Sequence, residues 1–328
     1  MQRWPIDLKS TDWMMSGLLQ PVVEALAGGK LVAVPTETVY GLAADATNGR
    51  ACAGIYEAKG RPSFNPLISH VESLEAAERH GLFDERAKAL AAAFWPGPLT
   101  MVVPRNPASP IASLTTAGLD SVALRVPAAP VMRWLASRLG RPLAAPSANL
   151  SGRISTTDAD AVIADLGDKV AHVIDAGPCP IGIESTIVSL TGETPALLRP
   201  GGVPAEEIEA VLGCRLIRAA ADDHAPQAPG MLTSHYAPAA AVRLEANSIA
   251  AGEAALLFGP NGLPGAGQAR ACLNLSPTGD LVEAAANLFS ALRQLDASGA
   301  AVIAVQAIPG EGLGEAINDR LRRAAAPR

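Results

Sequence analysis

The sequence has few aromatic and charged side chains and no long apolar run. Aromatic residues make up 4% of the 328 positions and charged residues 18%, whereas 49% are hydrophobic. No apolar stretch approaches the roughly 20 residues that a membrane-spanning helix needs. The start, MQRWPIDLKSTDW, lacks the apolar core of a signal peptide. Because the apolar residues are mainly Ala, Leu and Val, we expect a globular protein of helices packed on sheets, with no membrane span.

Basic clusters and cysteine motifs are also missing. The net charge is −6 and no block of Lys and Arg stands out. This argues against stable binding to nucleic acid, although a nucleotide needs only a local group of cations. The four cysteines, at 52, 179, 214 and 272, form no C-x-x-C pair. We therefore expect unpaired thiols in a reducing compartment, and hence a cytoplasmic location.

The common phosphate-binding and catalytic motifs are absent from the sequence. It has no G-x-x-x-x-G-K-[ST] loop, no G-x-G-x-x-G after the first expected strand, no G-x-S-x-G and no H-E-x-x-H. The five histidines show no ligand spacing, so no metal site is predicted. A phosphate group would have to be bound by side-chain cations, hydroxyls and loop amides instead.

The expected helices and strands alternate along the chain. Apolar periodicity predicts helices at 51–58, 130–139, 158–166, 280–297 and 314–325, and strands at 31–34, 67–71, 99–103, 122–126, 143–145, 187–190 and 196–198. Residues 1–17 are expected to be an irregular lead-in, and Thr156 or Thr157 to cap the helix at 158. Many strands are short and some follow one another without a helix, which predicts an α/β sheet of mixed direction.

The length favours two domains, the first larger than the second. We expect a catalytic domain over 1–217, a Pro-rich linker over 218–238, and a smaller α/β domain over 239–328. The linker carries polar and aromatic groups at 231–236 that a plain spacer does not need.

Polar side chains recur where the expected strands end. The stretches 33–70 and 143–152 hold most of them, and ligands collect at strand ends in α/β sheets. Each signal alone has a simpler interpretation. Lys59 and Arg61 are more often a solvated helix end, Thr36 a satisfied turn hydroxyl, and His70 a core histidine. Together they indicate chemistry by positioning and charge stabilisation, such as nucleotidyl transfer, because no Ser/His/Asp set and no carboxylate pair accompanies them.

Arg125 lies inside the apolar strand VALRVP. A buried guanidinium is costly unless it is paired. It could pair with a carboxylate such as Glu184, or receive the carboxylate of a ligand, and the sequence favours neither.

Eight ordered motifs resemble the long, two-domain form of the threonylcarbamoyl-AMP synthases: PTETVYGL, KGRPxxNPL, WPGPLT, VALRVP, AAPSANLSG, ESTIV, RPG and HYAP. The resemblance implies a YrdC-like mixed twisted sheet with flanking helices, followed by a smaller Rossmann-like α/β domain to which GLGEAINDRLRRAA would belong. It also implies that L-threonine, bicarbonate and ATP are condensed to threonylcarbamoyl-AMP and pyrophosphate. The product would pass to a tRNA threonylcarbamoyl-transfer machinery.

Residues are carried over from this resemblance position by position. Lys59 and Arg61 would be catalytic. The ATP contacts would be Lys59, Arg61, Asn65, Ser121, Ser147, Asn149, Ser155, Arg199 and Tyr236. The L-threonine contacts would be Thr36, His70, Arg125, Ala145 through its backbone, and Ser185. Mg²⁺ is expected on the ATP phosphates and water, since no acidic cage is visible. Tyr236 lies in the linker, so the linker is expected to cover the site as a lid.

Alternative functions are an RNA-binding module of translation, which the acidic charge disfavours, and a carbamoyl-adenylate-forming enzyme with another acceptor. An enzyme of the second class, of the hydrogenase-maturation type, would need zinc-finger-like and acylphosphatase-like segments that the sequence lacks.

Overall fold

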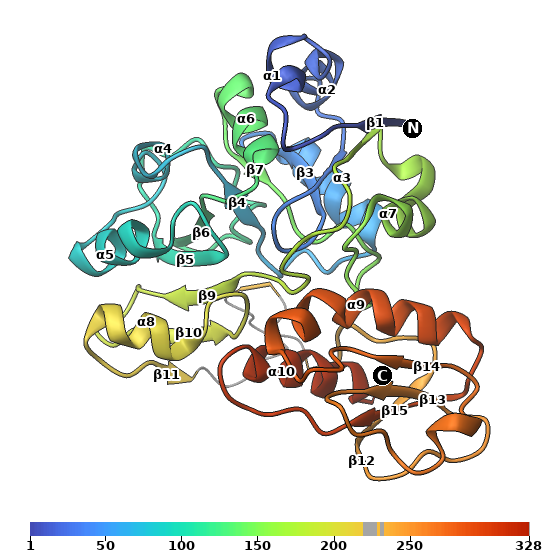
Figure 1. Ribbon diagram of the computed structural model, residues 1–328. Helices are drawn as coiled ribbons and strands as arrows, with labels where there is room; N and C mark the ends of the chain where they lie inside the picture. Colours follow the sequence, from blue (N-terminus) through green and yellow to red (C-terminus); the bar gives the residue numbers. More distant parts are fainter. Residues whose placement is uncertain (219–227, 230–232, 328) are drawn as a thin grey trace.

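The structure is a computed structural model of the chain that describes residues 1–218, 228–229 and 233–327. These residues form an 11-stranded sheet and a separate 4-stranded sheet, each with flanking helices (Figure 1). The predicted fold class, a mixed α/β sheet followed by a smaller α/β domain, is confirmed.

The first domain holds β1 to β11. Its elements are β1 (Gln2–Pro5), α1 (Asp12–Met15), α2 (Gln20–Ala27), β2 (Val32–Val34), β3 (Gly41–Asp45), α3 (Gly49–Lys59), β4 (Ile68–His70), α4 (Leu74–Glu78), α5 (Glu85–Phe94), β5 (Leu99–Pro104), β6 (Ser121–Arg125), α6 (Pro130–Leu139), β7 (Leu143–Ala144), α7 (Ala159–Leu166), η1 (Gly167–Lys169), β8 (His172–Asp175), β9 (Thr186–Ser189), β10 (Ala196–Arg199), α8 (Ala205–Leu212) and β11 (Ile217–Arg218).

The second domain holds a fully parallel sheet in the order β12-β15-β13-β14. Its elements are β12 (Ala241–Ala246), β13 (Ala254–Leu257), η2 (Ala266–Gln268), β14 (Cys272–Asn274), α9 (Leu281–Ala297), β15 (Val302–Gln306) and α10 (Leu313–Ala325). The helices α9 and α10 pack against each other and against this sheet.

The large sheet runs in the order β1-β8-β2-β3-β7-β4-β6-β5-β9-β10-β11 and has mixed direction. The strands β4 and β6 are parallel neighbours, and His70 stands opposite Arg125 in their register. The strand β9 runs parallel to β5, and β10 runs antiparallel to β9. This arrangement brings the start of β9, the end of β10 and the ends of β4 and β6 to one region of the sheet.

The alternation of side chains along β2 explains how the sheet is covered. Val32 and Val34 belong to the apolar cluster that includes α2 and α6, whereas Ala33 belongs to the cluster with α3. Successive residues of a strand point to opposite faces, so helices on both faces can bury the strand completely. This is why the apolar run 31–34 lacks polar residues.

Several local predictions fail. Residues 1–17 are not an irregular lead-in, since β1 pairs with β8 as an edge strand. The strands β11 and β14 were not expected either. The helix α7 is capped by Asp158, whose side chain accepts a hydrogen bond from the backbone N–H of Ala161, and not by Thr156 or Thr157.

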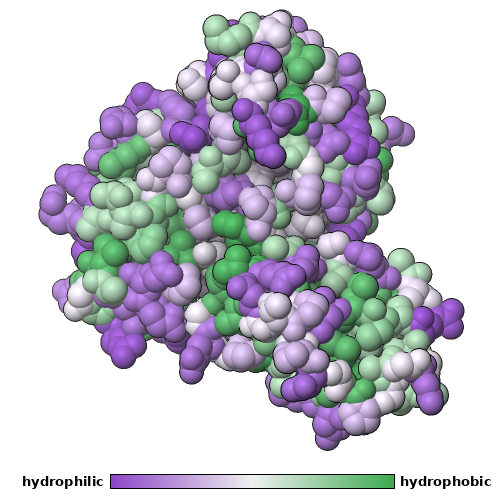
Figure 2. Space-filling view, viewed as in Figure 1, coloured by the Kyte–Doolittle hydropathy of each residue, from purple (hydrophilic) through white to green (hydrophobic). Residues whose placement is uncertain are grey.

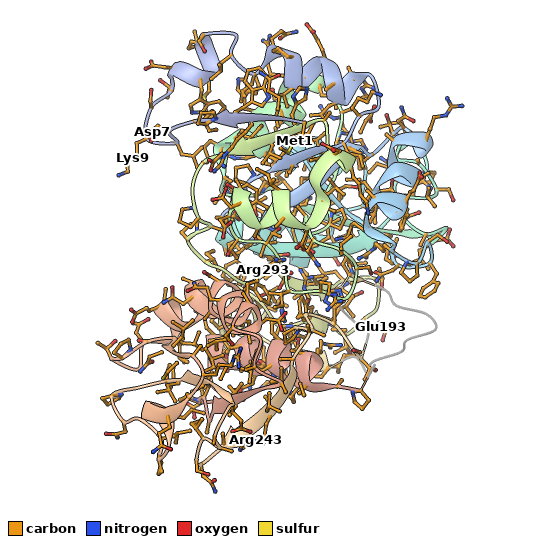
Figure 3. All side chains as sticks on the ribbon, turned by 90° about the vertical axis from the view of Figure 1, so that its right-hand side faces the viewer. Met1, Asp7, Lys9, Glu193, Arg243 and Arg293 are labelled. Carbon is orange, nitrogen blue, oxygen red and sulfur yellow. The ribbon has the colours of Figure 1, made fainter. Side chains whose placement is uncertain are left out.

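The two domains share an apolar core. Val39, Ile154 and Ile183 of the first domain cluster with the buried residues of α9 and the small sheet. Arg293 of α9 lies at the boundary (Figure 3) and forms an ion pair with Asp165 at 2.8 Å. On the face seen in Figure 2, apolar residues gather near the centre, where the two lobes meet, and polar residues dominate the outline. Among the described residues, no helix is long and apolar enough to cross a membrane.

Candidate functional site

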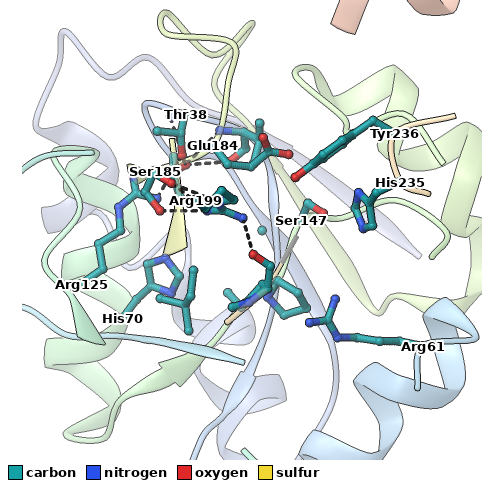
Figure 4. A pocket seen from close by; sticks show the side chains of 17 residues that line it. Thr38, Arg61, His70, Arg125, Ser147, Glu184, Ser185, Arg199, His235 and Tyr236 are labelled. Carbon is teal, nitrogen blue, oxygen red and sulfur yellow. Dashed lines mark hydrogen bonds between the residues drawn. The ribbon is translucent and has the colours of Figure 1, made fainter. Parts of the chain in front are cut away.

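A pocket opens on one face of the large sheet, close to the second domain (Figure 4). Ile68 and His70 are two residues apart on β4 and therefore face the same way. The pocket is lined by Thr36, Thr38, Val39, Gly41, Arg61, Ile68, His70, Arg125, Ala145, Pro146, Ser147, Glu184, Ser185, Arg199, Pro229, His235 and Tyr236. Segments spread over two hundred positions of the sequence thus converge on one cavity.

Most of the predicted site residues line this pocket, but some do not. Lys59, Asn65, Asn149 and Ser155 are buried behind its walls. Ser121 begins β6, at the opposite end of that strand from Arg125, and does not line the pocket. Sequence reasoning missed the roles of Thr38, Glu184, Pro229 and His235, although the first two belong to the quoted motifs PTETVYGL and ESTIV and the last to HYAP.

Arg125 is paired, but not with the partner that the sequence suggested. Its Nη2 donates to Glu37 Oε1 at 2.6 Å, its Nη1 to the Thr38 hydroxyl at 3.0 Å and its Nε to the Gly97 carbonyl at 3.2 Å. The suggested pairing with Glu184 is wrong. Glu37 lies in the loop between β2 and β3, three residues after the end of β2. Arg125 holds the pKa of the Glu37 carboxyl below its usual value, against the effect of burial.

Lys59 is the last residue of α3, and Gly60 ends the helix in the left-handed conformation. Its ammonium donates to the backbone carbonyls of Ser147, at 2.6 Å, and Asn149. The side chain is only 3% exposed, so the interpretation as a solvated helix end is wrong. Burial, and then Arg61, hold the pKa of Lys59 well below its usual value. Lys59 therefore fixes the loop that presents Ser147 to the pocket.

Arg61 and Arg199 supply positive charge to the pocket. Arg61 donates to the carbonyls of Asn65 and Pro66, and Arg199 to those of Ser185 and Pro229 and to the Ser185 hydroxyl. Neither has a carboxylate partner among the described residues. Burial lowers the pKa of Arg61 to about 10 and also lowers that of Arg199. Two buried guanidiniums that form no direct ion pair with a described carboxylate make a site for an anion with several oxygens.

The turn after β10 holds Arg199 against the start of β9. A Cβ at Gly201 would lie 2.4 Å from the backbone of Glu184 and Ser185. Only glycine allows this close approach, so the RPG motif explains how the Arg199 guanidinium reaches the carbonyl of Ser185. This close contact is the physical reason why position 201 in the motif is a glycine.

Several buried polar atoms around the pocket have no hydrogen-bond partner within the described part of the chain. They are both side-chain polar atoms of Asn65, Oδ1 of Asn149, Nδ1 of His70, Nδ1 of His235 and the Tyr236 hydroxyl. Buried polar groups are nearly always satisfied, so unsatisfied groups that cluster at one cavity indicate a polar ligand there.

His70 is buried beside Arg125, and both burial and that guanidinium oppose its protonation. They lower the pKa of His70 to about 3 from a usual 6.5. The unfolded chain therefore binds one more proton here between these values, and stability falls as the pH falls through this window. In the His70→Gln variant, we expect the free energy of unfolding to fall less steeply below pH 6.5, by up to about 1.4 kcal/mol per pH unit. Urea denaturation between pH 7 and 4.5 measures this; equal slopes would contradict it.

The pocket residues do not form a metal centre. No group of three His, Cys, Asp or Glu side chains able to hold a metal occurs among the described residues. The carboxylate of Glu184 lines the pocket but is already bound: the Ser155 hydroxyl donates to its Oε1 at 2.5 Å and Arg320 to its Oε2 at 2.9 Å. A divalent cation in this pocket would need most of its oxygen ligands from a substrate and water.

Comparisons with known proteins agree with this geometry. The family model described as "Telomere recombination" matches residues 24–201, and the one described as "Threonylcarbamoyl-AMP synthase, C-terminal domain" matches residues 203–326. A threonylcarbamoyl-AMP synthase of Pyrococcus abyssi is 43% identical over 316 residues, which cover 92% of either chain. The enzyme of the same name from Bacillus subtilis is 38% identical and covers 100% of this chain and 98% of its own length.

A solved structure resembles the whole chain. The crystal structure of P. abyssi Sua5 complexed with L-threonine has a TM-score of 0.86 and 36% sequence identity, and covers 99% of this chain and 97% of its own. The motif resemblance is thus confirmed over both domains. The chain belongs to the threonylcarbamoyl-AMP synthase family.

Proposed function

We propose that this protein condenses L-threonine, bicarbonate and ATP to threonylcarbamoyl-AMP and pyrophosphate, for the threonylcarbamoyladenosine modification of tRNA. The observation that carries the proposal is the pocket itself, which is lined by the ion-paired Arg125 and by the guanidiniums of Arg61 and Arg199, which form no direct ion pair with a described carboxylate. Such a pocket suits an amino acid carboxylate on one side and a triphosphate on the other. The family membership and the L-threonine complex of the similar structure support it.

The threonine side of the pocket would be built around Arg125. Each η nitrogen of Arg125 makes one hydrogen bond, to Glu37 or Thr38. One N–H on each therefore remains for a bidentate carboxylate. We assign Thr36, His70, Ser185 and the backbone of Ala145 to the same substrate. The threonine amine attacks the carbon of bicarbonate and water leaves, which gives a carbamate. A carbamate oxygen then attacks the α-phosphate of ATP, and pyrophosphate leaves.

The ATP side would use positioning and charge rather than covalent catalysis. Arg61 and Arg199 would bind phosphate oxygens and offset the charge on the leaving pyrophosphate, while Lys59 holds the loop of Ser147 and Asn149. Asn65, Ser121, Ser155 and Tyr236 complete the proposed ATP contacts. Mg²⁺ would be held by the phosphates and water.

The linker is proposed to act as a lid, with domain boundaries near 217 and 239. The free volume of the pocket is about 40 Å³, whereas small-molecule pockets usually measure at least about 300 Å³. Pro229, His235 and Tyr236 fill much of the wall, and the Pro229 carbonyl occupies Nη1 of Arg199. ATP would have to displace this segment. Most of the predicted linker, 219–227 and 230–232, lies outside the described residues.

Removing the aromatic ring of the lid tests its role. For Tyr236→Ala in the full chain, we expect pyrophosphate release to fall about 10- to 100-fold, the range for loss of a group that helps to position substrates. Tyr236→Phe keeps the ring and removes only the hydroxyl, so it separates the contribution of the ring from that of the hydroxyl. Near-normal release by Tyr236→Ala, or full activity of a chain cut after Arg218, would refute the lid.

The experiment that tests the proposed function is ATP–pyrophosphate exchange. We expect exchange that requires both L-threonine and bicarbonate. Exchange without threonine would indicate another acceptor, and RNA binding without any exchange would indicate a non-catalytic module of translation. The product would pass to a tRNA-modifying partner, and the free state of all four cysteines agrees with a cytoplasmic location.

A further inference from the structure

Arg320 of α10 reaches from the second domain to the back of the pocket. Its side chain is fully buried. Its Nε donates to Glu184 Oε2 at 2.9 Å, and its Nη1 donates to the Pro200 carbonyl at 2.9 Å and to Asp319 at 2.8 Å. The Arg320 guanidinium therefore contacts two segments of the first domain. It binds Glu184, which is next to Ser185, and Pro200, which is next to Arg199.

Glu184 is held by this contact as an anion in the pocket wall. The Ser155 hydroxyl binds its other oxygen. The charge of Arg320 and of Arg199 outweighs burial and lowers the pKa of Glu184 to about 2. Without Arg320, a negative charge in the wall would lose its closest counter-charge. A buried carboxylate that loses its partner is costly, and it would repel a bound triphosphate.

Arg320 also positions Tyr236. The guanidinium carbon of Arg320 lies 5.2 Å from the centre of the Tyr236 ring, within range of a cation–π interaction. Phe289 of α9 stacks on that ring with a centroid distance of 5.5 Å. In Figure 4, Tyr236 and Glu184 face each other across the upper part of the pocket. The second domain therefore fixes both, although Arg320 itself does not line the cavity.

We propose that Arg320 is a positioning residue for ATP: by neutralising Glu184 and holding Tyr236, it makes the second domain a required part of the nucleotide site. The inference rests on the proposed function. Arg320 makes no hydrogen bond or ion pair with Thr36, His70 or Arg125, and it reaches the residues assigned to L-threonine only indirectly, through Glu184, the chain neighbour of Ser185. Its loss should therefore weaken nucleotide binding much more than threonine binding, a difference that a general loss of stability would not produce.

The test measures binding of α,β-methylene-ATP and of L-threonine separately, by calorimetry, on the full chain. For Arg320→Met we expect the nucleotide dissociation constant to rise at least about tenfold, as for truncation of a buried charge pair, with that of L-threonine within about twofold. Arg320→Lys keeps the charge but not the planar fork, and should weaken nucleotide binding by about threefold or more. If Arg320→Met does not fold, the nucleotide and L-threonine dissociation constants are compared with Arg320→Lys instead.

A double variant isolates the charge effect. In Arg320→Met/Glu184→Gln, the unpaired carboxylate is gone, so we expect part of the lost nucleotide affinity to return. Glu315→Gln is the matched control, because Glu315 also lies on α10 and forms an ion pair across the domain boundary, with Arg218 of β11, but neither residue lines the pocket. We expect its nucleotide affinity to equal that of the unaltered protein.

The outcomes separate the inference from the proposed function. Equal losses for both ligands, unchanged nucleotide affinity in a folded Arg320 variant, or no recovery in the double variant would overturn the role of Arg320. Absence of threonine- and bicarbonate-dependent pyrophosphate exchange in the unaltered protein would instead overturn the proposed function, while the comparison of nucleotide affinities could still be made.

Discussion

Replacing Lys59 by alanine is expected to abolish pyrophosphate release. The ammonium holds the carbonyls of Ser147 and Asn149, and each hydrogen bond from a charged donor contributes about 1.5–3 kcal/mol. Alanine would leave both carbonyls unpaired and remove a positive charge from beside Arg61. Since the loop then loses its position relative to the phosphates, we expect the rate to fall at least about 100-fold, as when one preorganised donor is lost.

The control for this variant is Lys169→Ala. Lys169 also donates to a backbone carbonyl, that of Ala58, but it does not line the pocket. Its loss should leave pyrophosphate release close to normal. Release is measured with a coupled phosphate assay, and circular dichroism checks that both variants are folded. Near-normal release by Lys59→Ala would refute the role of Lys59 in the reaction.

Replacing Arg125 by methionine should remove L-threonine binding and destabilise the fold together. The Arg125–Glu37 pair is buried, with side chains 4% and 8% exposed. Breaking such a pair from one side costs about 3–5 kcal/mol of stability. A substrate carboxylate that loses its bidentate partner loses about 2–5 kcal/mol of binding free energy. Urea denaturation and calorimetry with L-threonine measure the two effects.

A second substitution separates stability from binding. Arg125→Met/Glu37→Gln removes the unpaired charge, so we expect much of the stability to return while L-threonine still does not bind. Arg79→Met is the control, because Arg79 pairs with Glu72 at the surface with a side chain 63% exposed, and such pairs contribute at most about 1 kcal/mol. Threonine binding by the double variant would contradict the role of Arg125 in holding the carboxylate.

Local sequence patterns correctly predict those elements whose structure is decided by residues close together in the chain. The helix α6 occupies 130–139 as predicted, because Pro130 starts it and Gly140, with a φ of 66°, ends it. The mixed direction of the large sheet also follows from short strands that lack a crossover helix between them. The resemblance of the motifs then pointed to most of the residues that line the pocket, since those motifs are the loops at the strand ends.

The partners of buried charges could not be predicted in this way. Arg125 pairs with Glu37 rather than Glu184, and Glu184 pairs with Arg320, which is 136 positions away. Lys59 donates to the carbonyls of Ser147 and Asn149, a contact that the sequence did not indicate. A buried Arg could pair with any of many carboxylates in the sequence. The carboxylate with which it does pair depends on how the strands and domains pack together.

The sequence by itself determined most of the elements, the class of sheet and the set of polar groups available for chemistry, because these depend on local periodicity, turn residues and side-chain type. Only the tertiary structure decided that the edge strand β1 exists, which cations face the pocket and which hold its loops, and that the second domain contributes Arg320 to the site. These features depend on strand order and domain packing, which bring together residues that no local pattern relates.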